Sequence, residues 1–326
     1  MLSSPAPLHI PDGFLSPAVA AVGWGIALGV ILLAGRRTRR QLGDRLVPMM
    51  GVLAAFLFAA QAVNFPVAGG TSGHLIGAAL AAILLGPWAA ALVMTSVVAV
   101  QGLLFQDGGL IVMGWNVINM AVVGGFSGHV AYRLARRLGG ASRPATMAAG
   151  FAAGWISVLA AALATAIELA ASGTVPLAVA ATAMASIHAL IGIGEGIITA
   201  AAVGLLLATR PEFLQARDVP GVRSASVILV GLSAVLLVAA ISPLASRAPD
   251  GLQAVAAEEG FLALARPGPA ALLPGYTVPS LADPALATMA AVGLGALVVF
   301  AAAVTIGRLA TLRGGREASE TPPPAR

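Results

Sequence analysis

Two histidines stand where apolar stretches begin, and they are the side chains of this sequence best suited to metal chemistry. The first, His9, opens the segment His9-Ile10-Pro11-Asp12-Gly13-Phe14-Leu15-Ser16, just ahead of the first apolar stretch. The second, His74, ends the segment Gly70-Thr71-Ser72-Gly73-His74, before another apolar stretch. Imidazole nitrogen suits nickel, cobalt, copper and zinc. If both histidines lie at one end of a helix bundle, they predict a transition-metal site.

The composition is that of a membrane protein. Of 326 residues, 59% are hydrophobic and 10% are charged, and the mean hydropathy is +0.94, which predicts a polytopic helical protein. The sequence has no lysine, which excludes a Walker A phosphate-binding loop, and no cysteine, which excludes thiolate ligands and cysteine nucleophiles. All eighteen basic residues are arginines in short runs, so the net charge of +5 reflects membrane topology and not nucleic-acid binding.

Nine apolar stretches can form helices, and the arginines beside them predict the topology. The stretches cover residues 15–34, 46–64, 74–86, 87–106, 111–134, 144–171, 177–209, 224–243 and 286–308. Sixteen arginines follow the first, fifth, seventh and ninth stretches, whereas Arg247 and Arg266 lie on the other side. The positive-inside rule makes the sixteen cytoplasmic and the N-terminus external. We therefore expect an all-α polytopic membrane helix bundle of about nine transmembrane helices, seven plus two, with His9 and His74 on its external face.

The same pattern divides the chain into five segments. Residues 1–7 form an N-terminal extension, and residues 8–209 form the first membrane domain. A polar cytoplasmic linker, residues 210–223, leads to a second domain at 224–310, in which two helices are joined by a long external loop. Residues 311–326 end in a polar, proline-rich sequence, so we expect a disordered cytoplasmic tail there.

Several motifs resemble one family of membrane proteins. The segment from His9 to Ser16 and the stretch Gly70–Gly77 closely resemble the CbiM/NikM family, the substrate-specific (S) components of energy-coupling-factor importers for cobalt and nickel. The likeness covers residues 8–209. Further stretches that fit the family are Leu85-Gly86-Pro87-Trp88, Gln101 to Gly109, and His188 to Gly196.

The C-terminal part resembles the PDGLE domain, a small two-helix accessory subunit. Here the motif reads Pro249-Asp250-Gly251-Leu252-Gln253, with Gln253 in place of the family's glutamate. Fusion of such a domain to the capture subunit is more typical of nickel than of cobalt systems. The resemblance therefore implies Ni(2+) as the transported substrate, with Co(2+) as the alternative.

The resemblance also implies how the chain works and with which partners. It would be a non-enzymatic component of an ABC-type transporter complex in the bacterial cell (inner) membrane, in contact with lipid. A transmembrane coupling (T) subunit and cytoplasmic ATPase (A) subunits would supply the energy, and the missing lysine agrees with ATP hydrolysis by partners. We expect no resident cofactor and no nucleic-acid partner.

A specific ligand set follows from the same resemblance. In the family the metal binds the free N-terminal amine, the histidine that follows it and a histidine of an external loop, which map to Leu8, His9 and His74. The amine, the next amide nitrogen and imidazole Nδ1 form fused chelate rings, and a second imidazole completes a square plane, a geometry typical of Ni(II) or Cu(II). Because the chelate requires a free amine on Leu8, we expect the mature chain to begin near Leu8.

Other ionisable residues are candidates for orienting these ligands. Asp12 either caps the first helix or accepts a hydrogen bond from an imidazole. His188 and Glu195, two turns apart on one helix face, either orient a ligating imidazole or form a buried hydrogen-bonded pair that fixes helix packing. We expect Asp250 to cap a short amphipathic helix. Residues 244–285 contain no histidine, cysteine or methionine, so the accessory domain is expected to act in loading or coupling rather than to supply ligands.

Two other functions are compatible with parts of the sequence. An intramembrane serine protease of rhomboid type would use Ser72 or Ser127, each within a Gly-x-Ser-Gly pattern, with His188 as the base. A stand-alone secondary metal permease would transport without ATPase partners. Four-residue motifs are weak signals in a chain with 39 glycines, so the protease hypothesis is the less favoured.

Overall fold

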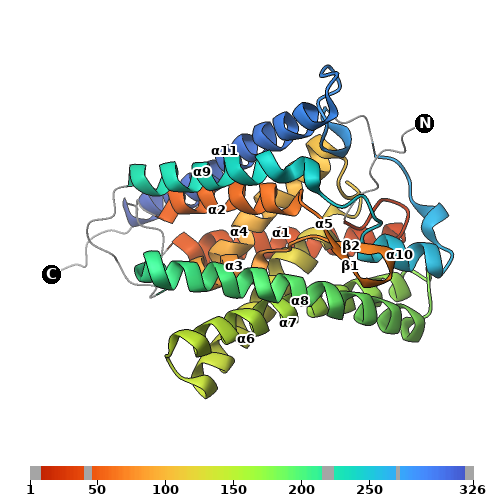
Figure 1. The fold of residues 1–326 in the computed structure, drawn as a ribbon, viewed down its shortest axis with the longest axis horizontal. Coiled ribbons are helices and arrows are strands. Elements are labelled where there is room, and N and C mark those ends of the chain that lie inside the picture. The colour runs from red at the N-terminus through yellow and green to blue at the C-terminus, as the bar shows by residue number, and fades with distance from the viewer. Residues whose placement is uncertain (1–8, 40–45, 215–223, 269–271, 320–326) are drawn as a thin grey trace.

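The protein is a bundle of helices in a computed structural model. The structure describes residues 9–39, 46–214, 224–268 and 272–319. Two short strands, β1 (Phe65–Val67) and β2 (Thr71–Gly73), lie at one end of the bundle with α5 and α10 (Figure 1). The helices are α1 (Pro17–Arg39), α2 (Leu46–Gln61), α3 (Ala78–Leu85), α4 (Pro87–Val100), η2 (Gln101–Phe105), α5 (Met113–Val117), η3 (Ile118–Gly124), α6 (Gly125–Gly139), α7 (Arg143–Ala171), α8 (Leu177–Thr209), η4 (Pro211–Leu214), α9 (Ser224–Ile241), α10 (Gly251–Glu258), η7 (Pro274–Tyr276) and α11 (Pro284–Ser319).

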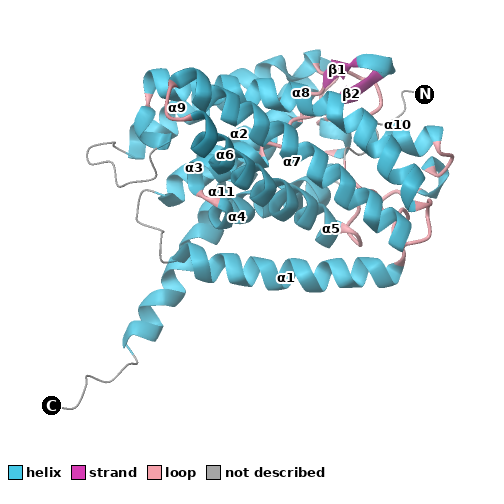
Figure 2. Ribbon diagram, turned by 90° about the horizontal axis from the view of Figure 1, so that it is seen from below, coloured by secondary structure: helices cyan, strands magenta, loops and turns pink. Residues whose placement is uncertain are grey.

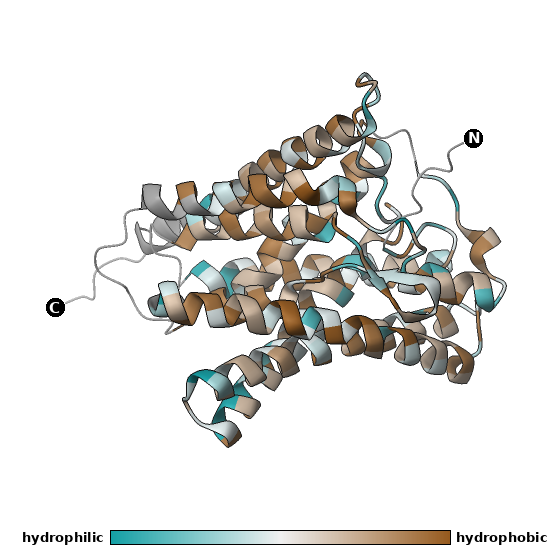
Figure 3. Ribbon diagram, viewed as in Figure 1, coloured by the Kyte–Doolittle hydropathy of each residue, from teal (hydrophilic) through white to brown (hydrophobic). Residues whose placement is uncertain are grey.

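Each apolar stretch predicted from the sequence contains a helix. Among the described residues, five helical spans are long and apolar enough to cross a membrane: α1, α4 together with η2, α7, α8, and α11 as far as Ala310. Outward-facing apolar side chains run along them, and on α1 Val22, Leu28 and Leu32 are more than half exposed. Figure 3 shows apolar residues along the helices and hydrophilic ones gathered toward the ends of the bundle. A helical membrane protein is thereby confirmed, whereas nine crossings and an external N-terminus stay predictions.

The all-α prediction is wrong at one place, the connection between α2 and α3. There β1 and β2 form an antiparallel hairpin, drawn in magenta in Figure 2, in which Phe65 is opposite Gly73 and Val67 is opposite Thr71. Gly69 and Gly70, with φ of 79° and 75°, make the turn, because glycine adopts this region without steric cost. The hairpin fixes the direction in which the chain enters the site at His74.

The fifth predicted stretch is helical but not a uniform α-helix. It consists of α5, the π-helical turns of η3, and α6, and α4 likewise ends in the π-helical η2. π-helical segments are rare and occur often at functional sites. One residue of η3, Asn119, lines the cavity at the candidate site. The departure from α-geometry therefore coincides with the region where the sequence predicts function.

The C-terminal helices pack directly on the first part of the chain. Both α9 and α11 contact α2. A Cβ atom on Gly51 of α2 would lie 2.6 Å from Cγ2 of Val304, and one on Gly231 of α9 would lie 2.0 Å from Cγ1 of Val52. Small residues let membrane helices approach this closely. The accessory part is thus integrated into the bundle.

The predicted boundaries near the C-terminus need one correction. The backbone of α11 continues to Ser319, so residues 311–319 are helical and the predicted disordered tail does not begin at 311. The physical reason is that the prolines, which stop a helix, begin only at 322. Residues 320–326, the extension 1–7, Leu8 and most of the linker (215–223) lie outside the described residues, so the predictions for them stay predictions.

Candidate metal centre

The start of the described chain is held in place by α5 and the loop that precedes it. The backbone N–H of Ile10 donates to Oδ1 of Asn116 at 3.1 Å, and the Asn116 amide donates back to the carbonyl of Ile10 at 3.1 Å. The N–H of Gly109 adds a third hydrogen bond to the same carbonyl, at 2.9 Å. These contacts fix the backbone that follows His9, whose side chain is buried.

Asp12 binds the loop that leads into α5 and caps no helix. Its carboxylate accepts hydrogen bonds from the backbone N–H groups of Leu110, Ile111 and Val112, the residues just before α5. Both predicted roles, a cap on the first helix and a direct partner of an imidazole, are therefore wrong. The N-terminal segment passes close to this loop, so Asp12 meets loop amides and not those at the start of α1.

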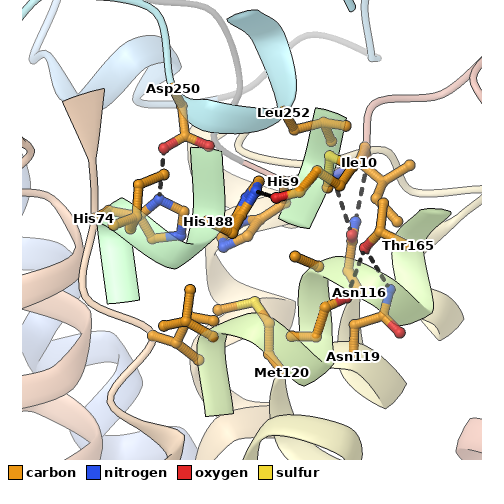
Figure 4. A pocket seen from close by; sticks show the side chains of 16 residues that line it. His9, Ile10, His74, Asn116, Asn119, Met120, Thr165, His188, Asp250 and Leu252 are labelled. Atoms are coloured by element: carbon orange, nitrogen blue, oxygen red, sulfur yellow. Dashed lines mark hydrogen bonds and ion pairs between the residues drawn. The ribbon is translucent and has the colours of Figure 1, made fainter. Parts of the chain in front are cut away.

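His9 and His74 face each other across one cavity. Their ring centroids are 5.4 Å apart and the rings are nearly perpendicular, at 88°. The cavity measures about 70 Å³, and His188, Asn119 and Thr165 also line it (Figure 4). The structure thus brings together both histidines that the sequence placed at one end of the bundle, although 65 positions separate them.

The His74 imidazole is paired with a carboxylate from the C-terminal part of the chain. Its Nδ1 lies 3.1 Å from Oδ1 of Asp250, and the two side chains are 11% and 4% exposed. Burial is the largest single influence and lowers the pKa of His74, but the charge of Asp250 and its hydrogen bond, together with the charges of Asp107 and Glu195, raise this pKa above its ordinary value. Asp250 does occupy the N-cap position of α10, yet its side chain makes no cap hydrogen bond. Its carboxylate instead faces Nδ1 of His74, so Nε2 is the nitrogen of the His74 ring that Asp250 does not contact.

The His9 imidazole is paired with a second buried carboxylate. Its Nδ1 lies 3.2 Å from the backbone oxygen and 3.3 Å from Oδ1 of Asp107. The hydroxyl of Tyr276 donates to the other carboxylate oxygen of Asp107 at 2.5 Å. Burial would raise the pKa of Asp107, but His9 and the Tyr276 hydroxyl hold it at about 2. The Nε2 atom of His9 is buried without a hydrogen-bond partner, which is costly unless something binds there.

The two ionisable residues of α8 act separately and do not pair with each other. Glu195, fully buried, accepts hydrogen bonds from the backbone N–H groups of Ile76 at 2.7 Å and Gly77 at 2.8 Å. It thereby anchors the chain just after His74. His188 lines the cavity, and its Nδ1 lies 2.8 Å from the carbonyl of Met184 in its own helix. The predicted pairing between His188 and Glu195 is therefore wrong, because Glu195 faces the loop after the hairpin and His188 faces the cavity.

Within the described ranges, no group of three or more His, Cys, Asp or Glu side chains is arranged to hold a metal ion. Two imidazoles alone complete no coordination sphere of the kinds that transition metals adopt in proteins. The same cavity is lined by His188, Asn119, Met120 and Met184, whose nitrogen, oxygen and sulfur atoms are further candidate donors, and Leu8, which precedes His9, lies outside the described residues.

Sequence reasoning missed three residues that shape the site: Asp107, Asp250 and Tyr276. Asp107 lies in a glycine-containing segment that resembles an external turn, and its neighbour Gln106 has a left-handed φ of 57°. The partners of His9 and His74 lie far away in the sequence, with Asp250 following His74 by 176 positions. A buried carboxylate beside a predicted histidine ligand would have been the signal, but burial is visible only in the folded chain.

The geometry gives the serine-protease alternative no support. The Ser72 hydroxyl donates to the carbonyl of Ala248 at 2.8 Å, and the Ser127 hydroxyl donates to the carbonyl of Gly124 at 3.3 Å. The base of that hypothesis, His188, has its Nδ1 at a backbone carbonyl of its own helix. A nucleophilic serine requires a base within hydrogen-bonding reach, and these contacts place both hydroxyls on backbone oxygens.

Comparison with known proteins shows to which family the chain belongs. Residues 9–213 match the family described as the cobalt uptake substrate-specific transmembrane region (CbiM), and residues 225–312 match the PDGLE domain. The chain belongs to the CbiM family. This membership confirms the resemblance found in the sequence and a role in transport rather than in catalysis.

Relatives that resemble the chain over most of its length are named as transport proteins. A protein of Archaeoglobus fulgidus named as a fused nickel transport protein, NikMN, is 37% identical to this chain over 311 residues. The match covers 93% of this chain and 99% of the relative. The cobalt transport protein CbiM of Sorangium cellulosum is 34% identical over 64% of this chain and 94% of its own. A crystal structure of a transition metal transporter superposes with a TM-score of 0.56, at 34% identity over 65% of this chain and 100% of that one.

Proposed function

We propose that this chain is the metal-capturing (S) component of an ATP-driven energy-coupling-factor importer for nickel, with cobalt as the less favoured substrate. The observation that carries the proposal is the pair of imidazoles, His9 and His74, whose centroids lie 5.4 Å apart across one cavity. Each ring has its Nδ1 beside a buried carboxylate. Histidines that bind metals commonly donate their other ring N–H to a carboxylate, which fixes the tautomer and the ring orientation.

In this proposal the ion binds His9, His74 and the amine of Leu8, close to a square plane that suits Ni(II). The chelate predicted from the family uses Nδ1 of His9, the atom that contacts Asp107 in the structure. Binding through Nδ1 therefore requires His9 to leave Asp107, whereas binding through the partnerless Nε2 does not. Only binding through Nδ1 closes the chelate rings with the His9 amide nitrogen and the Leu8 amine, whereas binding through Nε2 takes its remaining donors from other groups that line the cavity.

The proposal assigns the segments of the chain to separate tasks. Residues 8–209 capture the metal on the external side of a bacterial cell membrane, residues 210–223 link the two parts on the cytoplasmic side, and residues 224–310 form the accessory domain. The matches to the CbiM family over 9–213 and to the PDGLE domain over 225–312 support this division. A transmembrane coupling (T) subunit and cytoplasmic ATPase (A) subunits supply the energy, because the chain has no lysine for a Walker A loop.

A direct test is calorimetric titration of the purified, metal-free full chain with Ni(II), and with Co(II) in competition. The variants His9→Asn and His74→Asn should lose tight nickel binding. His129→Asn is the matched control, because His129 lies on α6 with its Nδ1 3.0 Å from the carbonyl of Ala82, away from the cavity. Equal nickel binding by all three variants would refute the site.

Transport by the complex is tested separately from binding. Vesicles that contain this chain together with its coupling and ATPase subunits should accumulate radioactive nickel only when ATP is present inside. Vesicles with the chain alone should not accumulate it. Uptake by the chain alone would instead establish a stand-alone permease and would contradict the proposed dependence on partners.

A further inference from the structure

One external segment of the accessory domain, described over residues 242–268 and 272–283, reaches the surroundings of both candidate metal ligands. Asp250 comes from its first half and Tyr276 from its second half. The first contacts His74 directly, and the second reaches His9 through Asp107. A segment expected from its composition to contain no ligands thus lies next to both imidazoles.

The Asp250 contact is supported by backbone pairing with the hairpin. Ser72 of β2 donates from its backbone N–H to the carbonyl of Pro249 at 2.8 Å, and from its hydroxyl to the carbonyl of Ala248 at 2.8 Å. Ser72 and Asp250 also form a β-bridge. Ser72 is two residues before His74, so these bonds fix the distance between the Asp250 carboxylate and the imidazole. The carboxylate is 4% exposed and makes no hydrogen bond to its own helix.

The Tyr276 contact is built with comparable rigidity. Tyr276 has a left-handed φ of 57°, a conformation that costs energy for a residue with a bulky side chain and persists only where its surroundings impose it. Its ring stacks on that of Phe105, with centroids 4.8 Å apart and planes at 24°. The amide of Gln101 donates to its hydroxyl at 3.1 Å. That hydroxyl then donates to Asp107, whose other carboxylate oxygen faces His9.

We infer that Asp250 and Tyr276 are positioning residues of the metal site, so that residues 242–268 and 272–283 of the accessory domain orient both imidazoles for tight capture. Asp250 orients the His74 ring directly, and Tyr276 orients the His9 ring by holding Asp107. A single segment that touches both partners sets the two rings relative to each other, which neither the hairpin nor the N-terminal segment does alone. This inference rests on the proposed function and on its second binding route, since it presumes that His9 and His74 bind the ion through Nε2 while each Nδ1 keeps its carboxylate partner.

The test uses two conservative variants of the full chain, Asp250→Asn and Tyr276→Phe. Each keeps the shape of the side chain and removes the charge or the hydroxyl that positions an imidazole. Glu258→Gln is the control for the first, because Glu258 is an exposed carboxylate on α10. Tyr132→Phe, at the other tyrosine of the sequence, is the control for the second.

Nickel affinity is measured by calorimetry on purified protein, and the melting temperature is measured with and without nickel. We expect each positioning variant to bind nickel about 10–100-fold more weakly than wild type, the loss typical for residues that orient a metal ligand. Both controls should bind as wild type does. The metal-free melting temperature should stay at the wild-type value, while the rise caused by nickel becomes smaller because it depends on affinity.

Three outcomes decide the inference. It is overturned if Asp250→Asn and Tyr276→Phe bind nickel as tightly as their controls. It is also overturned if the metal-free melting temperature falls along with affinity, since that result indicates a role in folding and not in positioning. The proposed function itself has failed if the wild-type chain binds no nickel or if its nickel binding does not depend on His74. That failure is seen in the wild type and in the His74 variant, so it is distinguishable from a failure of the inference, which is seen only in Asp250→Asn and Tyr276→Phe.

Discussion

Replacing His74 by asparagine and by alanine should separate its role as a ligand from its role as a partner of Asp250. The side-chain amide of asparagine sits at the same bond distance from the backbone as Nδ1 of histidine. It can therefore donate to Asp250 as the imidazole does at 3.1 Å, but it offers no imidazole nitrogen to a metal. Alanine removes both the ligand and the donor.

The expected losses differ in size for the two variants. Structural zinc sites with four ligands bind with about 10–16 kcal/mol, so one ligand is worth about 3 kcal/mol and its loss weakens binding about 100-fold. Both variants should show at least that loss for nickel. Alanine should in addition destabilise the metal-free protein by about 1–3 kcal/mol, since it leaves the carboxylate of Asp250, 4% exposed, without its hydrogen-bond donor.

Calorimetry measures the nickel affinity of each variant, and thermal unfolding in detergent measures stability. The asparagine variant should melt close to wild type without metal, and the alanine variant should melt lower. If His74→Asn retains wild-type nickel affinity, His74 is not a ligand. If the two variants melt at the same temperature, the Asp250 contact contributes nothing to the fold.

Three further results are expected. Nickel affinity should fall at least about tenfold for each pH unit below the pKa of His74, because the ion must displace the imidazole proton along with the protons of its other nitrogen donors. Asp250 contributes to raising that pKa, so in Asp250→Asn the fall should begin at a lower pH in titrations of affinity against pH. Glu195→Gln should lower the free energy of unfolding by about 1.5–3 kcal/mol, the contribution of one hydrogen bond to a charged group. It should also weaken nickel binding, because Glu195 holds the backbone at Ile76 and Gly77, just after His74. Unchanged stability and affinity would show that these hydrogen bonds of Glu195 are dispensable. Gly77→Ala should be more destabilising than Gly70→Ala by about 1–3 kcal/mol in thermal unfolding. Both glycines have a left-handed φ, but only at Gly77 would the new methyl group overlap a neighbour, the Leu57 side chain at 2.3 Å. Equal losses of stability in the two variants would contradict the close packing at Gly77.

The helices could be predicted because hydropathy is a local property of the sequence. Each of the nine apolar stretches contains a helix, and the short third stretch is α3 with eight residues. The hairpin at Phe65–Gly73 was missed, because two three-residue strands leave no periodic signal. The π-helical turns of η3 were missed as well, since they depend on packing against α7 and α4 and not on composition.

At the site, too, the residues marked by local sequence could be predicted, and the residues brought in by distant contacts could not. The two histidines could be found from short motifs and from topology, since each stands at the start of an apolar stretch. Their partners could not be found, because Asp107 meets His9 across 98 positions and Asp250 meets His74 across 176. The roles of Asp12 and Glu195 were also set by distant backbone amides, at Leu110 to Val112 and at Ile76 and Gly77.

The charges around the cavity give a physical reason for two carboxylates beside two imidazoles. A buried carboxylate is costly unless a positive group is close, and here Asp107 lies against His9 and Asp250 against His74. A divalent cation bound to two neutral imidazoles would offset both carboxylates, and only the amide nitrogen of the proposed chelate, deprotonated on binding, would add a negative charge. A monovalent ion would leave one more negative charge buried. A site of this composition therefore favours a doubly charged ion over a singly charged one, before ligand geometry selects among the transition metals. Neither carboxylate belongs to the pair of histidine motifs that could be found in the sequence.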